Sequence, residues 1–150
     1  MTIGQRNNNP LNIRRGKTLW KGEVLPQRGQ LPVGSGAIGE LATEVGEGAG
    51  FCKFLTVEWG IRAAFRLLET YRKKYKAVCI QDIITRWAPP SENDTSGYIK
   101  AVCYLTGFGG QERLETAQLP KLVAAMARIE SGMYLTATQL AEAYRMSKTP

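Results

Sequence analysis

Histidine is absent from this chain of 150 residues. Ser-His-Asp and Cys-His catalytic arrangements and His-containing zinc sites all need an imidazole, so the chain cannot build them by itself. The groups left for moving protons are carboxylates, tyrosine, lysine and amides. The composition therefore leaves carboxylate acid–base chemistry as the most open catalytic route, and no metal site or cofactor is expected.

Cysteines and long apolar runs are scarce as well. The three cysteines, Cys52, Cys79 and Cys103, are far apart and form no C-x-x-C pair. Such spacing predicts buried thiols in a reducing compartment rather than a disulfide framework. No apolar run approaches the roughly 20 residues that span a bilayer. The first six residues contain no apolar signal-peptide core, so we expect synthesis in the cytoplasm and delivery by other machinery.

The balance of charge is basic, with a formal net charge of +7. This favours a polyanionic partner, such as nucleic acid, an anionic membrane surface or the bacterial wall. The densest basic run is Arg72–Lys74 with Lys76. It falls at the end of an expected helix, where cations suit the helix dipole; a nucleic-acid patch is the alternative. No familiar nucleic-acid motif is present, so no specific nucleic-acid partner is expected.

The apolar spacing predicts one mostly α domain over residues 1–150, with a small irregular β-hairpin region near the N-terminus (α+β). The clearest helix covers residues 57–75, where apolar side chains recur at alternating intervals of four and three. Further helices are expected over residues 80–87, 95–106, about 120–131 and from 136 on, with 146–150 as a frayed tail. The Gly-rich stretch 23–50 predicts an irregular loop, and short strands are expected around 41–44 and 51–54.

Four asparagines crowd into six positions around Pro10. Asn side chains compete with the backbone for hydrogen bonds and Pro removes a donor, so residues 6–14 predict a shaped turn, here called the Asn turn. Its amides offer both donors and acceptors, as the hydroxyl and N-acetyl groups of a sugar require. A simple loop with Asx-turns is the alternative. The candidate sugar ligands are Asn7, Asn8, Asn9 and Asn12.

An apolar helix over residues 122–131 ends with Glu130 in its last turn, followed by Ser131 and Gly132. A carboxylate there faces the negative end of the helix dipole, and burial would raise its pKa further. A raised pKa is what a general acid working near neutrality requires. The alternative is that Glu130 is a solvated residue at the end of a helix.

Several motifs together resemble one family. They are the Arg6–Arg14 run (RNNNPxNIR), Trp20-Lys21-Gly22, Phe51–Phe54 followed by Gly60–Ala63, and Arg86–Thr95 with Tyr98. The resemblance is to small virion-associated proteins of phages and prophages, related to lysozyme-like cell-wall hydrolases. The Glu-Ser-Gly at the helix end is similar to that of lytic transglycosylases and autolysin-type glucosaminidases, in which this Glu protonates the glycosidic oxygen. Here the Glu follows the other motifs, so the order resembles a circular permutation of the lysozyme-like fold.

The resemblance implies cleavage of peptidoglycan between N-acetylmuramic acid and N-acetylglucosamine by a muramidase, glucosaminidase or lytic transglycosylase. Glu130 would be the general acid, Glu44 the second carboxylate with Glu47 as its rival, and Tyr98 would lie near the reaction centre. The residues expected to line the cleft beside the asparagines are Arg14, Trp20, Glu92 and Asn93. The alternatives are a core position for Trp20 and for Tyr98, an exposed charge on a loop for Glu44, and a capping role for Glu92.

The resemblance also implies partners and a place of action. Glycan strands would be the substrate, and a phage particle or secretion apparatus would carry the protein to the wall. A non-catalytic virion protein that keeps a glycan-binding, lysozyme-like fold is the alternative function.

Overall fold

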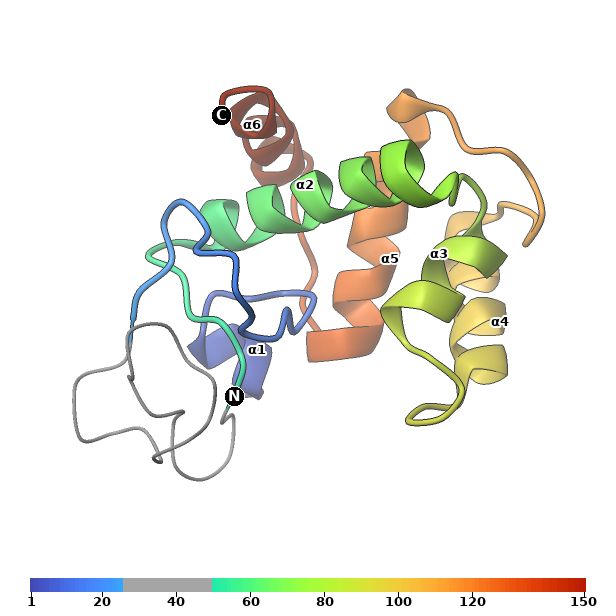
Figure 1. The fold of residues 1–150 in the computed structure, drawn as a ribbon, viewed down its shortest axis with the longest axis horizontal. Coiled ribbons are helices and arrows are strands. Elements are labelled where there is room, and N and C mark those ends of the chain that lie inside the picture. The colour runs from blue at the N-terminus through green and yellow to red at the C-terminus, as the bar shows by residue number, and fades with distance from the viewer. Residues whose placement is uncertain (26–49) are drawn as a thin grey trace.

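The computed structural model describes residues 1–25 and 50–150, which are mainly helical. The elements are α1 (Ile3–Arg6), α2 (Val57–Tyr75), α3 (Ile80–Trp87), α4 (Thr95–Thr106), the short 3₁₀ helix η2 (Thr116–Gln118), α5 (Leu119–Ser131) and α6 (Ala137–Ser147). Figure 1 shows α2 running across the molecule, with the N-terminal segment near one end and α3 and α4 near the other. Helix α5 crosses α2 between them, and its C-terminal end approaches α1. The expected mostly α fold is confirmed.

The helix ends follow the expected capping chemistry. Thr56 begins α2 by accepting a hydrogen bond from the Trp59 amide. Asp94 begins α4 in the same way, with its side chain accepting from the Gly97 amide. Gly107 and Gly132 follow α4 and α5 in the left-handed conformation, with φ of 77° and 70°. Glycine adopts that conformation without steric cost, so these two residues end their helices at the expected places.

The core extends from the N-terminal segment along α2 and α5 to α3 and α4, and α6 packs against α2. Helix α2 contributes the fully buried Ile61 and Leu68, from the stripe that predicted the helix. The largest other buried side chains are Phe54, Leu11, Ile80, Ile83, Ile84, Leu114, Leu122 and Met126. Removing this apolar surface from water is the main source of stability. None of the helices formed by residues 1–25 and 50–150 has the length and apolarity to cross a membrane.

The N-terminal region differs from the expectation in two ways. A short helix, α1, precedes the Asn turn; Thr2 and Gln5 form a capping box at its start. The strand expected over residues 51–54 is wrong, because that segment makes two isolated antiparallel bridges, from Phe51 to Arg14 and from Phe54 to Glu23. Side-chain amides of the Asn turn supply hydrogen bonds that a regular ladder would otherwise provide. The other expected strand, 41–44, lies outside the described residues.

The expectation of a frayed C-terminal tail is also wrong. Arg62 is buried on α2, with its Nε donating to Met146 O at 3.1 Å and its Nη2 to Thr149 O at 2.7 Å. Arg66 Nη1 donates to Ser147 O at 3.1 Å. These carbonyls at the end of α6 have no partner within the helix and carry partial negative charge, so the two guanidinium groups satisfy and neutralise them.

Two glycines allow the Asn turn to lie between α2 and the end of α5. A Cβ at Gly60 of α2 would lie 2.1 Å from Asn8 O and 3.0 Å from Pro10 Cδ. A Cβ at Gly4 of α1 would lie 2.5 Å from Ser131 Cβ. All three separations are shorter than van der Waals contact. The absence of a side chain at these two positions therefore sets how closely the N-terminal segment approaches the last turn of α5.

Candidate active site

Asn9 holds the Asn turn together from inside. Its side chain is fully buried. Its Nδ2 donates to Ile13 O at 3.0 Å and Cys52 O at 2.9 Å, and its Oδ1 accepts from the Ile13 amide at 2.9 Å. Both amide hydrogens are thus used by the backbone, and the group is closed to solvent. The structure gives Asn9 a structural role in place of the expected contact with sugar.

Asn7 and Asn8 connect the turn to the segment before α2. The Asn8 Nδ2 donates to Phe54 O at 3.1 Å and to Leu55 O at 3.3 Å. Asn7 O accepts from the Phe54 amide at 2.8 Å. Asn8 is also held in the left-handed conformation with φ of 50°, which Asn tolerates better than most residues. These contacts make the two residues parts of the scaffold, and both remain only partly buried.

Asn12 meets Glu130 at the end of α5. Its Nδ2 donates to Glu130 O at 2.9 Å and lies 3.5 Å from Glu130 Oε1. The neighbouring Ser131 Oγ donates to Pro10 O at 2.8 Å, and Thr2 Oγ1 donates to Ser131 O at the same distance. Glu130 therefore lies next to the Asn turn, as expected. Hydrogen bonds at Glu130 itself and at the adjacent Ser131 fix this arrangement.

Tyr98 and Trp87 approach the same carboxyl from the other helices. The Tyr98 hydroxyl on α4 donates to Glu130 Oε2 at 3.0 Å. Trp87, the last residue of α3, lies near enough for its indole N–H, which can only donate, to favour the charged form of Glu130. The Asn turn, α3 and α4 thus each bring a donor to one half-buried carboxyl. Trp87 was not among the residues predicted for the site, because its position in the sequence does not reveal which long-range acceptor it meets.

Burial raises the pKa of Glu130 above its usual value. Hydrogen bonds from Tyr98, Asn12 and Trp87, together with the positive charge of Arg14, act in the opposite direction and are the weaker influence. Burial and the adjacent Glu130 carboxylate raise the pKa of the Tyr98 hydroxyl, so that Tyr98 stays a hydrogen-bond donor. A carboxyl of this kind can hold a proton closer to neutrality and release it to an acceptor placed beside it.

Arg14 and Trp20 lie around the Asn turn in different environments. Arg14 is exposed, and its guanidinium carbon lies 4.6 Å from the centroid of the Phe51 ring. Trp20 is half-buried and packs against the core, with its main-chain N–H bonded to Glu23 Oε1 at 3.1 Å. The positive charge of Arg14 lowers the pKa of Glu130. Trp20 has the position of a core residue.

The loop between α3 and α4 holds Glu92 and Asn93. Both are exposed, and Asn93 Nδ2 donates to Pro89 O at 3.2 Å. Asp94, rather than Glu92, caps α4. The described contacts around Glu130 do not include Glu92 or Asn93. Glu44 and its rival Glu47 lie outside the described residues.

Comparison with known proteins gives this site a context. No protein-family model matches the chain. Protein P5 of Pseudoalteromonas phage PM2 is 37% identical over 132 residues, which span 86% of this chain and 71% of P5. The chain belongs to the family of protein P5. The expected relationship to a phage protein is thereby confirmed. The name P5 states no activity, so any activity of the family is inferred from the site.

The hydrogen bond from Tyr98 to Glu130 leads to a prediction about how activity depends on pH in this member of the P5 family. Changing Tyr98→Phe removes a donor that favours the charged form of Glu130, so the pKa of Glu130 is expected to rise further. If Glu130 works as an acid, the alkaline limb of the rate–pH profile should move to higher pH while the fold is retained. Measuring fragment release from peptidoglycan against pH checks this. An unmoved or acid-shifted limb would contradict a role for Tyr98 in setting the proton affinity of Glu130.

Proposed function

We propose that the protein cleaves the glycan strands of peptidoglycan, as a muramidase, glucosaminidase or lytic transglycosylase with a lysozyme-like arrangement. One observation carries the proposal. The Glu130 carboxyl, at the end of an apolar helix, is half-buried with a raised pKa and is held by Tyr98 and by Asn12 of the Asn turn. An oriented carboxyl that can be protonated near neutrality is the main requirement of a general acid in glycoside cleavage.

In the proposed reaction, protonated Glu130 donates its proton to the glycosidic oxygen as the C–O bond breaks. The leaving sugar departs as an alcohol, and positive charge develops on the ring through an oxocarbenium-like transition state. The resulting Glu130 carboxylate then removes a proton from the nucleophile. That nucleophile is water in a hydrolase and the sugar's own hydroxyl in a lytic transglycosylase. Tyr98 and Asn12 keep the carboxyl oriented through both steps.

A second carboxylate would be used to attack the sugar or to activate water. The candidate from the sequence is Glu44, which the structure does not describe. A lytic transglycosylase can work without this group, because the substrate's own groups assist. Glu130 is therefore the one carboxyl that the reaction requires in either case, and analysis of the products distinguishes hydrolysis from transglycosylation.

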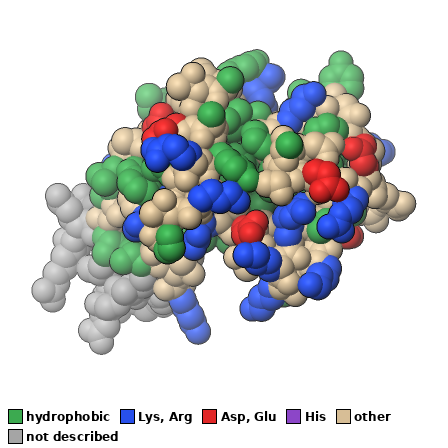
Figure 2. All heavy atoms as spheres, turned by 90° about the horizontal axis from the view of Figure 1, so that it is seen from above, with side chains coloured by type: hydrophobic (Ala, Val, Ile, Leu, Met, Phe, Trp, Pro, Cys, Tyr) green, Lys and Arg blue, Asp and Glu red, His purple; other side chains and the backbone are tan. Residues whose placement is uncertain are grey.

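The surface charge favours approach to the wall. Figure 2 shows Lys and Arg side chains spread over the visible face, with fewer Asp and Glu between them. Together with the net charge of +7, this favours attraction to anionic wall polymers. The basic run at the end of α2 is partly engaged within the fold. Arg72 Nη1 donates to Leu114 O at 2.6 Å, and Lys73 pairs with Glu69 at 3.1 Å.

The direct test is release of soluble fragments from purified peptidoglycan by the wild-type protein. We expect muropeptide release, with mass spectrometry showing either a new reducing end or the anhydro product of a transglycosylase. The sugar found at the new end identifies the bond. Protein inactivated by heat is the control. A folded protein that releases nothing from walls of several chemotypes would contradict the proposal.

The relationship to P5 favours a second candidate, a phage virion protein that binds glycan without cutting it. That function predicts incorporation into particles, or pull-down with peptidoglycan, by a protein that releases no fragments. Binding and incorporation would then be unchanged in Glu130→Gln. Comparing the wild type with Glu130→Gln in both fragment release and glycan binding therefore distinguishes the two candidate functions.

A further inference from the structure

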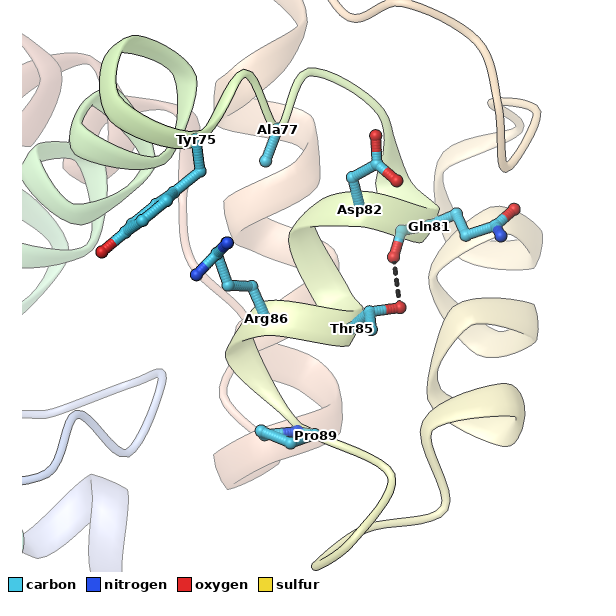
Figure 3. A pocket seen from close by; sticks show the side chains of 7 residues that line it. All are labelled: Tyr75, Ala77, Gln81, Asp82, Thr85, Arg86 and Pro89. Atoms are coloured by element: carbon cyan, nitrogen blue, oxygen red, sulfur yellow. Dashed lines mark hydrogen bonds between the residues drawn. The ribbon is translucent and has the colours of Figure 1, made fainter.

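A pocket of about 670 Å³ lies beside α3, on the side that faces the end of α2. Its walls are formed by Tyr75, Ala77, Gln81, Asp82, Thr85, Arg86 and Pro89 (Figure 3). The volume lies within the range of small-molecule sites, about 300–1,000 Å³. Most such sites are mainly apolar, whereas this pocket presents a cation, a carboxylate, an amide and a hydroxyl. Its lining suits a charged ligand better than an apolar one.

Arg86 is positioned by an aromatic ring. Its guanidinium carbon lies 3.5 Å from the centroid of the Tyr75 ring. Stacking uses the face of the guanidinium group and leaves its N–H edges in the plane, where they can bind a carboxylate through two parallel hydrogen bonds. Tyr75 therefore orients Arg86 without consuming its donors.

Asp82 supplies the opposite charge on the same wall. It lies four residues before Arg86 on α3, a spacing at which Asp and Arg commonly form an ion pair. The ion pairs found among residues 1–25 and 50–150 do not include this one. Figure 3 shows Arg86 pointing toward Tyr75 and away from Asp82. The pocket thus holds a cation and an anion that are not paired with each other; the Asp82 carboxylate lies beside the Cys79 thiol, whose pKa is raised by burial and by that carboxylate.

The pocket is adjacent to the Glu130 site along the chain. Arg86 immediately precedes Trp87, whose indole lies beside the Glu130 carboxyl. Pro89 lies in the segment that leads to α4 and Tyr98. The pocket and the Glu130 site therefore share helix α3 and the segment that follows it.

We propose that this pocket binds the peptide that peptidoglycan carries on its muramic acid. Arg86 pairs with a carboxylate of the peptide, Asp82 with its free amino group, and Tyr75 and Pro89 contact its aliphatic parts. The inference rests on the proposed function, and it adds a substrate class: strands that carry peptide with free amino and carboxylate groups. The glycan strand itself offers no free cationic group, so the Asp82–Arg86 wall distinguishes peptide-bearing from stripped strands.

Binding can be measured without any cleavage. The probe is a soluble tetrapeptide, L-Ala-γ-D-Glu-diaminopimelate-D-Ala, titrated calorimetrically into the wild type, Arg86→Gln and a control, Arg145→Gln, on the exposed face of α6. We expect binding by the wild type and the control, and at least about tenfold weaker binding by Arg86→Gln. A peptide with amidated carboxylates and an acetylated amine should bind more weakly to the wild type by a similar factor. Equal binding by Arg86→Gln, or none by the wild type at about 10 mM peptide, would overturn the proposal.

Kinetics provide the second measurement. On peptide-bearing strands, Arg86→Gln should raise KM about tenfold with kcat little changed, because it removes binding and leaves Glu130 in place. On strands stripped of peptide by an amidase, the two proteins should be equal. A loss on both substrates would overturn the peptide assignment. A wild type that cuts neither substrate contradicts the proposed function, whereas the calorimetric result still decides whether the pocket binds peptide.

Discussion

Replacing Glu130 with glutamine is expected to abolish glycan cleavage while the protein remains folded. Glutamine keeps the size of the side chain, and its one carbonyl oxygen can still accept the hydrogen bond from Tyr98, but its amide is not an acid. General acid catalysis typically contributes about 10²–10⁴-fold, so a loss of about 10³-fold or more is expected. Fragment release from purified peptidoglycan, compared at equal concentrations of wild type and variant, measures it.

The matched control is Glu142→Gln, which makes the same change of charge on the exposed surface of α6. Within the part of the chain that the structure describes, Glu142 pairs with Arg145 alone, across an exposed contact that is worth little in water. Its activity should equal that of the wild type. If Glu130→Gln released fragments as fast as Glu142→Gln, Glu130 would not be the acid, and Glu44 or Glu92 would be the next residue to change.

Glu130→Gln should also be more stable than the wild type at neutral and alkaline pH. Burial raises the pKa of Glu130 above its value in the unfolded chain. Between those two pKa values the folded state binds more protons, so the free energy of unfolding decreases as pH rises and then levels off above the folded pKa. Glutamine avoids the cost of the buried charge. Thermal melts should show the largest gain in Tm above the folded pKa and none well below the unfolded one; a gain that increases toward acid pH would contradict this account.

Changing Gly60→Ala is expected to lower the free energy of unfolding by about 2–3 kcal/mol. Inside a helix this substitution normally stabilises by up to about 1 kcal/mol, because alanine has the higher helix propensity. Here the added Cβ would lie 2.1 Å from Asn8 O, a backbone atom of the Asn turn. Asn8 is held in place by its own bonds to Phe54 and Leu55, so relief requires moving the turn as a whole. Urea denaturation measures the effect.

The control is Gly16→Ala, since a Cβ at Gly16 meets nothing within 4 Å. Its stability should change little. A displaced Asn turn also moves Asn12 away from Glu130, so the folded fraction of Gly60→Ala should lose activity as well. A Gly60→Ala protein that is as stable as the wild type, or more stable, would show that the Asn turn can shift with no loss in the free energy of unfolding.

The sequence predicted the helices from residue 57 onward well, because each depends on local information. The apolar stripe of α2 and the caps at Thr56, Asp94 and Gly132 all involve neighbours within a turn or two. Local pattern is what periodicity and capping rules detect. Glu130 was found for the same reason, from its place at a helix end.

The N-terminal region was harder to predict because its partners are distant in sequence. Asn9 looks like any asparagine in a turn until its bond to Cys52 is seen. The tail after α6 was expected to fray, because nothing near it shows that Arg62 and Arg66 on α2 reach its carbonyls. Trp87 was not predicted as a site residue, because its place in the sequence does not show that Glu130 lies beside it. In each case the missing information was a contact, not a propensity.

Asn12 and Glu130 are bonded to each other across 118 positions of sequence. Chains grow on the ribosome at about 5–20 residues per second, so roughly 6–24 s pass between the synthesis of the two residues. During that interval the Asn turn has neither the glutamate nor the last turn of α5 to dock on. The site is thus assembled only when most of the chain has been made, and contacts of such long range also slow folding. An unfinished or truncated chain that lacks the end of α5 would therefore lack the Glu130 site altogether.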